Sequence, residues 1–429
     1  MRLNLEALEA LRPWPVYLLV AALPFSLAAV NISKLFLILT ALAIFSAAMV
    51  KHRHLATLVS FKTVRLILLM LGLLGLSLTY TSAPIQTALL GWAKYAKLIT
   101  FILILLTIQH YSEARKAVAI LVIAQTFVMF TTYLMSWGWQ VPWVPSDRFS
   151  PERMLGNRHD FAAYSGYLDQ SLMTAGYAAM CWHLRDKFPG RWGATLGTVL
   201  SCLAFVNVVL LLPGRSGQVA LFAVAMLALF WQINRKRHLY LLAVPLILLA
   251  FAVTIPSAFR DRMSLVVTQA QTYSGQAEAG NSTGIRLNLW QRAGQAIVER
   301  PLTGYGVASF DHEYRRLEGL SSGSPNASNI HNAHQEYLQW GVQLGIGGIG
   351  LMLALITLMV RDARKHPTSA RRATQSLVAI FAIACLFNCA LFDALIGDYF
   401  CVTIALLLAL GATEVTLEES DKTSRTIAA

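Results

Sequence analysis

The chain has 429 residues, of which 56% are hydrophobic and only 13% carry a charge. Long apolar runs recur from one end to the other, which excludes a soluble fold, and they lack the alternation of polar and apolar residues expected of a membrane barrel. The formal net charge of +13 therefore bears on membrane orientation, and we expect no nucleic-acid partner.

The apolar runs are roughly 17–22 residues long, the length at which an α-helix crosses the hydrocarbon core of a bilayer. The sequence thus predicts an all-α polytopic protein with about twelve transmembrane helices in contact with membrane lipids. The expected spans are 13–29, 34–50, 64–80, 93–109, 116–136, 161–183, 194–211, 217–233, 239–256, 341–360, 374–392 and 399–414.

Most of the 35 lysines and arginines fall in alternate connections between these spans. Because such residues stay on the cytoplasmic side, both termini are expected in the cytoplasm. On this layout 1–256 holds nine spans with a periplasmic loop near 137–160, 257–340 is a large periplasmic loop, 341–414 holds three spans, and 415–429 is a cytoplasmic tail. The large loop is expected to be partly helical, because it carries an apolar stripe at helical spacing that suits a membrane surface. The stripe comprises Leu287, Leu289, Trp290, Ala293 and Ile297.

Two arginines lie where the orientation rule disfavours them. Arg215 falls in a tight turn between two spans, within Pro213-Gly-Arg-Ser-Gly-Gln218, and Arg286 falls at the start of the striped helix. An arginine at bilayer depth is costly unless it is paired or hydrated, so it usually marks function. We expect an anion site at a helix start for Arg215. The alternatives are a snorkelling side chain for Arg215 and a solvated helix face for Arg286.

Other basic residues also collect on the expected outer side. Arg148, Arg153 and Arg158 recur in the first long loop without an equal number of carboxylates, and Lys94 and Lys97 lie at the outer end of the fourth span. Each alone is a weak signal. Together with the two arginines above, they predict an outward-facing pocket for a strongly anionic ligand such as a pyrophosphate.

The most concentrated polar chemistry lies in 329–348, where a hydrophilic loop runs into an apolar, glycine-spaced segment. His334 can accept a proton near neutral pH and is the candidate general base; a helix-capping histidine is the alternative. His331 precedes it by three residues and would share its face if a helix began that early. No cysteine or carboxylate cluster accompanies the two histidines, so we expect no metal site and no other cofactor. The glycines favour close helix packing over a phosphate loop.

Three stretches carry a resemblance to a known family: His334-Gln335 followed by Gly345-Ile-Gly-Gly348, Arg215 in its Ser-Gly-Gln context, and Arg286 with Trp290, Pro301-Leu-Thr-Gly-Tyr-Gly306 and Phe310. In these stretches the sequence resembles the O-antigen ligase family, which shares a superfamily with O-antigen polymerases and bacterial protein O-oligosaccharyltransferases. A large loop before the tenth expected span also fits that family. The resemblance covers nearly the whole chain, but it separates ligase from polymerase poorly.

The resemblance implies a metal-independent, inverting glycosyltransferase of GT-C-like architecture in the bacterial inner membrane. Such an enzyme moves a polysaccharide from undecaprenyl pyrophosphate to a terminal sugar of lipid A–core on the periplasmic face. Arg215 and Arg286 would hold the pyrophosphate and stabilise its charge, and His334 would take the proton of the attacking hydroxyl. The remaining residues expected to contact substrate are Gln335, Arg153, Arg158, Lys94 and Lys97.

Three alternatives remain open. An O-antigen polymerase would use the same donor with another lipid-linked chain as acceptor, and a protein O-glycosylating enzyme usually carries more sequence after its last span. A transporter would place ionisable groups near the bilayer midplane, whereas the unexplained charges here lie at the outer rim. Asp393 and Asp398, at the outer end of the last hairpin, are either orienting groups or ordinary loop residues.

Overall fold

The computed structural model of the chain describes residues 9–46, 58–149, 160–233, 282–320 and 331–428. These residues form helices joined by short connections, and none of them forms a strand, so the all-α prediction is confirmed for this part of the chain. The helices are α2 (Trp14–Ala22), α3 (Leu27–Ser46), α5 (Lys62–Leu76), η1 (Ser77–Thr79), α6 (Ile85–Lys94), α7 (Lys97–Thr107), α8 (Tyr111–Ser136), η2 (Ser146–Phe149), α10 (Tyr167–His183), η3 (Arg185–Lys187), α11 (Gly193–Val206), η4 (Asn207–Leu211), α12 (Arg215–Gln232), α15 (Ser282–Glu299), α16 (Phe310–Glu318), α17 (Glu336–Ala363), α18 (Thr368–Phe387) and α19 (Ala394–Ala428).

Seven helical segments of the described chain are long and apolar enough to cross a membrane, which makes this a polytopic membrane protein. They are Lys62–Thr79, Ile85–Thr107, Tyr111–Ser136, Gly193–Leu211, Glu336–Ala363, Thr368–Phe387 and Ala394–Ser420. The other expected spans fall on the shorter or more polar helices α2, α3, α10 and α12 or, for 239–256, outside the described residues. The expected total of about twelve therefore stays a prediction.

The first expected span, 13–29, is not one continuous helix. Helix α2 ends at Ala22, a turn follows, and α3 begins at Leu27, earlier than the expected start of the second span. Pro24 lies in this turn. Its ring fixes φ and it has no N–H to donate to the carbonyl four residues earlier, so the hydrogen-bond ladder of the helix stops there.

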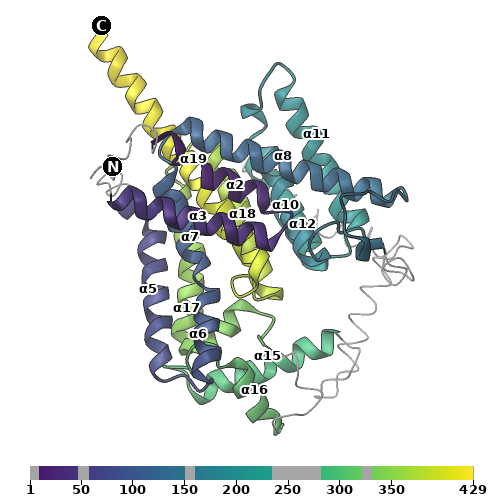
Figure 1. Cartoon of the computed structure of the whole chain (residues 1–429), viewed down its shortest axis with the longest axis vertical. Helices are drawn as coiled ribbons and strands as arrows, with labels where there is room; N and C mark the ends of the chain where they lie inside the picture. The colour runs from purple at the N-terminus through teal and green to yellow at the C-terminus, as the bar shows by residue number, and fades with distance from the viewer. Residues whose placement is uncertain (1–8, 47–57, 150–159, 234–281, 321–330, 429) are drawn as a thin grey trace.

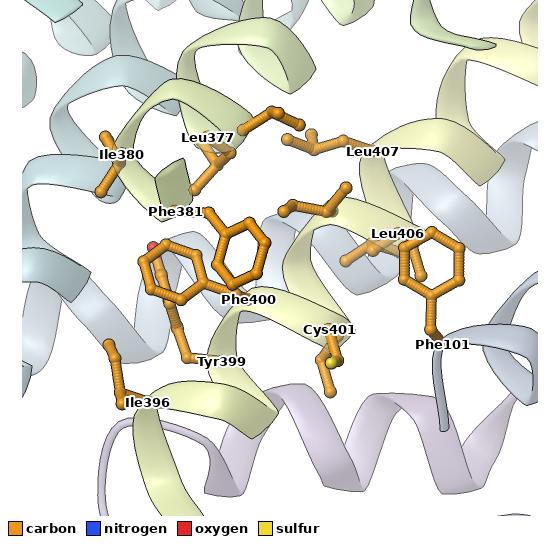
Figure 2. Close-up of a cluster of buried hydrophobic side chains, with 14 of the residues drawn as sticks. Phe101, Leu377, Ile380, Phe381, Ile396, Tyr399, Phe400, Cys401, Leu406 and Leu407 are labelled. Atoms are coloured by element: carbon orange, nitrogen blue, oxygen red, sulfur yellow. The ribbon is translucent and has the colours of Figure 1, made fainter. Parts of the chain in front are cut away.

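Helix α19 lies at the centre of the bundle. In its membrane-spanning window 89% of the residues are buried, compared with 28% for α11 with η4, which therefore presents most of its sides outward. Phe381 of α18 and Phe400 of α19 meet with ring centroids 5.2 Å apart, and Tyr399 lies beside Phe400 (Figure 2). Phe101 of α7 belongs to the same buried cluster. Because lipid tails are as apolar as these side chains, close van der Waals packing of this kind holds the helices together.

Helices α15 and α16 lie at the end of the molecule opposite the C-terminus and pack against α17 (Figure 1). The striped helix predicted from the sequence is present as α15, but its apolar face turns toward protein and not along a membrane surface. Leu289, Ala293 and Ile297 are buried in one cluster with Phe310 of α16 and Val342 of α17. An amphipathic helix buries its stripe against the nearest apolar surface, and here the neighbouring helices supply it.

Candidate functional site

Arg215 is the first residue of α12, whose opening turn lies directly against α10. A Cβ atom added at Gly214 or Gly217 would collide with the hydroxyl of Ser171, so these two glycines allow the close approach of the helices. The half-buried Arg215 is thereby placed at a helix N-terminus, where free backbone N–H groups favour an anion. Within the described residues, no carboxylate forms an ion pair with it.

Arg286 extends from α15 into the same region. Burial lowers the pKa of its guanidinium; nearby Tyr167 opposes this effect, and the positive charge of Arg215 adds to it. Two arginines from separate elements therefore face one another across a region that is partly shielded from water. Since like charges repel most when they are desolvated, this arrangement is favourable chiefly when an anion lies between them. Tyr167 begins α10 and was not singled out by the sequence.

His334 precedes α17 in a left-handed backbone conformation, with φ of +47°. Such a conformation costs energy in a residue other than glycine and persists where its surroundings impose it, frequently at functional sites. The backbone N–H of His334 donates to the Asn332 side chain at 2.9 Å. His334 is exposed to solvent on one side, but protein atoms surround part of it. This partial burial lowers the pKa of the imidazole, and the positive charge of Arg286 lowers it further. His334 therefore lies close to Arg286, and the lowered pKa favours the neutral imidazole that a proton acceptor requires.

His331 is exposed and lies before the start of α17 at Glu336, so the two histidines do not share a helical face. In the part of the chain that the structure describes, no three His, Cys, Asp or Glu side chains gather as metal ligands would. The expected independence from metal stays a prediction, since it concerns the reaction.

Gln335 is the N-cap residue of α17. The next residue, Glu336, joins the start of α17 to the loop between α18 and α19. One oxygen of the fully buried Glu336 carboxylate accepts from the backbone N–H groups of Leu391 and Phe392, at 2.7 and 3.3 Å. Its other oxygen accepts from the Trp340 indole at 3.0 Å. The sequence offered one signal for Glu336, an acidic residue at the start of an apolar helix, but we expected no role for it.

Helix α17 is broken at Leu344 and Gly345, where the backbone leaves helical geometry and Gly345 adopts φ of +65°. The turn at 301–306 inserts its backbone there. The N–H of Ile346 donates to Pro301 at 2.8 Å, and the N–H groups of Tyr305 and Gly306 donate to carbonyls of the segment before the break, at 2.8 and 3.0 Å. Any side chain at position 345 would collide with the Pro301 carbonyl. The residues between His334 and Gly345 therefore form the helical segment that precedes the break. Gly345 leaves room for the backbone of the 301–306 turn.

The loop that follows α18 carries Asp393 and meets both expected lysines. Burial raises the pKa of the Asp393 carboxyl, and the charges of Lys97 and Lys94 partly offset that shift. Lys97 is itself buried and donates to the backbone carbonyls of Asp393 and Ala394, which ties α7 to this loop. The exposed Lys94 places its ammonium 3.8 Å from the centroid of the Phe392 ring, leaving it able to turn toward a ligand.

Two other expected residues, Asp398 and Arg148, make their contacts elsewhere. Asp398 is 1% exposed and pairs with Lys34 at 2.8 Å, so it links α19 to α3. Arg148 donates to the backbone carbonyls of Ser165 and Tyr164, at 2.9 and 3.0 Å, and so shapes its own loop. Arg153 and Arg158 lie outside the described residues.

Residues 199–353, which contain Arg215, Arg286 and His334, match the sequence profile of a family described as O-antigen ligase. The expected resemblance to the O-antigen ligase family is confirmed. The chain is also 27% identical over 173 residues to an uncharacterized protein of Haemophilus influenzae. That match covers 39% of this chain and 43% of the relative, so the chain spans less than half of the relative's length.

Proposed function

We propose that this protein, part of which matches the O-antigen ligase family, transfers a polysaccharide from undecaprenyl pyrophosphate to a terminal sugar of lipid A–core. The observation that carries the proposal is the meeting of Arg215, Arg286 and His334, which come from three separate elements within the segment matched to the family. Two arginines without carboxylate partners among the described residues suit a multiply charged pyrophosphate. A neutral imidazole next to them suits the activation of a sugar hydroxyl.

The donor would bind with its pyrophosphate between the two arginines, at the N-terminus of α12. As the bond between the anomeric carbon and the pyrophosphate oxygen breaks, the electron pair remains on that oxygen. Arg215 and Arg286 stabilise the charge that develops there, and they act strongly because the region is partly desolvated. The exposed ammonium of Lys94 supplies a further contact for the outer phosphate or for the sugar attached to it.

The acceptor hydroxyl would approach the anomeric carbon from the face opposite the leaving pyrophosphate. His334 removes the hydroxyl proton as the new glycosidic bond forms, and the configuration of the anomeric carbon inverts. Gln335 lies next to His334 and is placed to hydrogen-bond a sugar hydroxyl. Glu336 and Lys97 position these groups from behind, through the loop that carries Asp393.

We place the site on the periplasmic face, as the distribution of basic residues predicts. Leu302 is 87% exposed at the end of the molecule that bears His334, and the exposed Arg364 lies at the opposite end of α17. Cysteines introduced at the two positions should react oppositely with a membrane-impermeant thiol reagent in spheroplasts. Labelling of Arg364→Cys with protection of Leu302→Cys would reverse the orientation and remove the periplasmic assignment.

The acceptor is tested by the lipopolysaccharide profile of a deletion strain. A ligase defect should leave lipid A–core without long chains, while lipid-linked polymer accumulates. Chains of a single repeat unit would instead identify an O-antigen polymerase, and a normal profile with unglycosylated proteins would identify a protein O-oligosaccharyltransferase. Complementation with the wild-type gene, which should restore the profile, controls for effects of the deletion on neighbouring genes, and Arg215→Ala should fail to restore it although the protein inserts normally.

A further inference from the structure

A second polar site lies at the other end of the bundle, between the ends of α10 and α12 and the start of α18. A cavity of about 310 Å³ opens there, far along these helices from Arg215. The residues that matter for its chemistry are Trp182, Arg185, Asp186, Gln232, Thr368 and Arg372. None of them takes part in the transfer reaction proposed above, so the cavity calls for a separate explanation.

Two arginines in this cavity are held in place by indoles. The Arg185 guanidinium lies 4.5 Å from the Trp182 ring and donates to the Trp182 carbonyl at 2.6 Å. The Arg372 guanidinium lies 5.5 Å from the Trp231 ring and donates to the Trp231 carbonyl at 3.3 Å. A guanidinium has five N–H donors, so each arginine keeps donors for a ligand. No ion pair joins either of them to a carboxylate of the described chain.

The start of α18 adds backbone donors to the same cavity. The N–H groups of a first turn have no acceptor within their own helix. Here the N-cap residue is Pro367, so they receive no side-chain cap either. Thr368 and Ser369 of that turn line the cavity and add hydroxyl groups. Two guanidiniums, a helix N-terminus and hydroxyls converge on a space of this size, which is the donor set that phosphate oxygens require.

We propose that this cavity binds the phosphate group of a membrane phospholipid headgroup. Arg185 and Arg372 would each donate to phosphate oxygens, with the first turn of α18 completing the site. The cavity lies at the ends of membrane helices and is lined by the Trp182 indole, as expected where headgroups and interfacial aromatic residues meet. Basic pockets between helix ends of this kind recognise anionic lipid headgroups. The site is independent of the transfer reaction, and its positive charge predicts that it faces the cytoplasmic leaflet.

The test uses the purified full-length protein after removal of endogenous lipid, with bound ligand measured by native mass spectrometry. The probes are dioctanoyl phosphatidylglycerol, dioctanoylglycerol, which lacks the phosphate, and inorganic phosphate. We expect the phosphatidylglycerol to bind and the dioctanoylglycerol not to. Replacing both arginines, as Arg185→Gln with Arg372→Gln, should weaken that binding by about tenfold or more, because each removes charge-assisted hydrogen bonds.

The matched control is Arg361→Gln with Arg364→Gln, which removes the same charge at the same end from exposed residues that do not line the cavity. It should leave binding within about twofold of wild type. Asp186→Asn should act in the opposite direction and tighten binding, because it removes a carboxylate from the cavity wall. This variant also tests the proposal if the double arginine variant does not fold.

Equal losses in the two arginine pairs would show nonspecific attraction and overturn the proposal. So would equal binding of dioctanoylglycerol, or weaker binding in Asp186→Asn. If inorganic phosphate saturated the cavity and the phosphatidylglycerol did not bind, the cavity would be a site for a free anion. That result would overturn the proposal that the bound phosphate belongs to a lipid.

Discussion

The anchor formed by Glu336 can be tested without measuring catalysis. In Glu336→Gln the amide keeps the shape of the side chain but has only one acceptor oxygen. If that oxygen stays with the N–H groups of Leu391 and Phe392, the amide nitrogen faces the Trp340 indole N–H, and two buried donors oppose one another. The reverse orientation sets the amide nitrogen against both backbone donors, so neither arrangement satisfies the site.

Leaving a buried donor without an acceptor costs about 1–3 kcal/mol, and we take about 2 kcal/mol for this site. Glu336 holds the loop at 388–393 against α17. The substitution should therefore destabilise the closed state of this loop, relative to its open state, by that amount. Cys389 lies in this loop and is fully buried. If alkylation of Cys389 requires local opening, its rate should rise roughly 30-fold, the factor that corresponds to about 2 kcal/mol.

The assay is the rate of Cys389 alkylation by N-ethylmaleimide in detergent, followed by peptide mapping with mass spectrometry. Tyr337→Phe is the control, because it removes a hydrogen bond from the same turn of α17, to the Ala382 carbonyl at 3.0 Å, without touching the loop. The control should label at close to the wild-type rate. An unchanged alkylation rate in Glu336→Gln would refute the anchoring role. An equal rise in both variants would also refute it, because it would indicate a general loosening of α17.

With purified protein, lipid-linked donor and lipid A–core acceptor, His334→Ala should lower the transfer rate on the order of 10²–10⁴-fold, the usual contribution of a positioned proton acceptor. His331→Ala should be milder; an equal loss would shift the catalytic role away from His334 alone. Arg215→Lys should lose most activity at normal protein levels, because lysine cannot form paired hydrogen bonds to phosphate, and full activity would support a snorkelling side chain. Activity should fall as pH drops through the pKa of His334, and because burial and Arg286 lower that pKa, the fall should come at a more acidic pH than for a free histidine. An acid limb above the ordinary histidine range would contradict this. EDTA should leave the rate unchanged, whereas inhibition that a divalent ion reverses would indicate a metal-assisted reaction.

The sequence by itself determined the helical membrane character of the chain, because apolar runs of spanning length have no other stable form in lipid. It also singled out Arg215, Arg286 and His334 through local signals: charges where orientation disfavours them, and polar groups where a loop meets an apolar helix. These signals depend on residue type and spacing along the chain, so no tertiary structure was needed to find them.

Only the tertiary structure decided which groups lie together. The approach of Arg286 to Arg215, and of His334 to Arg286, depends on α15 docking against α17. From the sequence, the stripe of α15 suited a membrane surface instead. The insertion of the 301–306 turn at Gly345 is likewise a backbone contact between segments far apart in sequence. The hydropathy of a segment does not reveal such pairings, because the hydrogen-bond partners of its backbone groups lie in a distant segment of the chain.

The same limit explains why the sequence did not reveal the partners of Glu336 and Lys97. In the sequence Glu336 is one polar residue beside a more conspicuous histidine, and Lys97 is a cation at the outer end of a span. In the structure both are buried and bonded to backbone groups of the loop that joins α18 to α19. Whether a charged side chain meets a ligand or a buried backbone group depends on which loop folds over it, and that is decided by packing between distant helices.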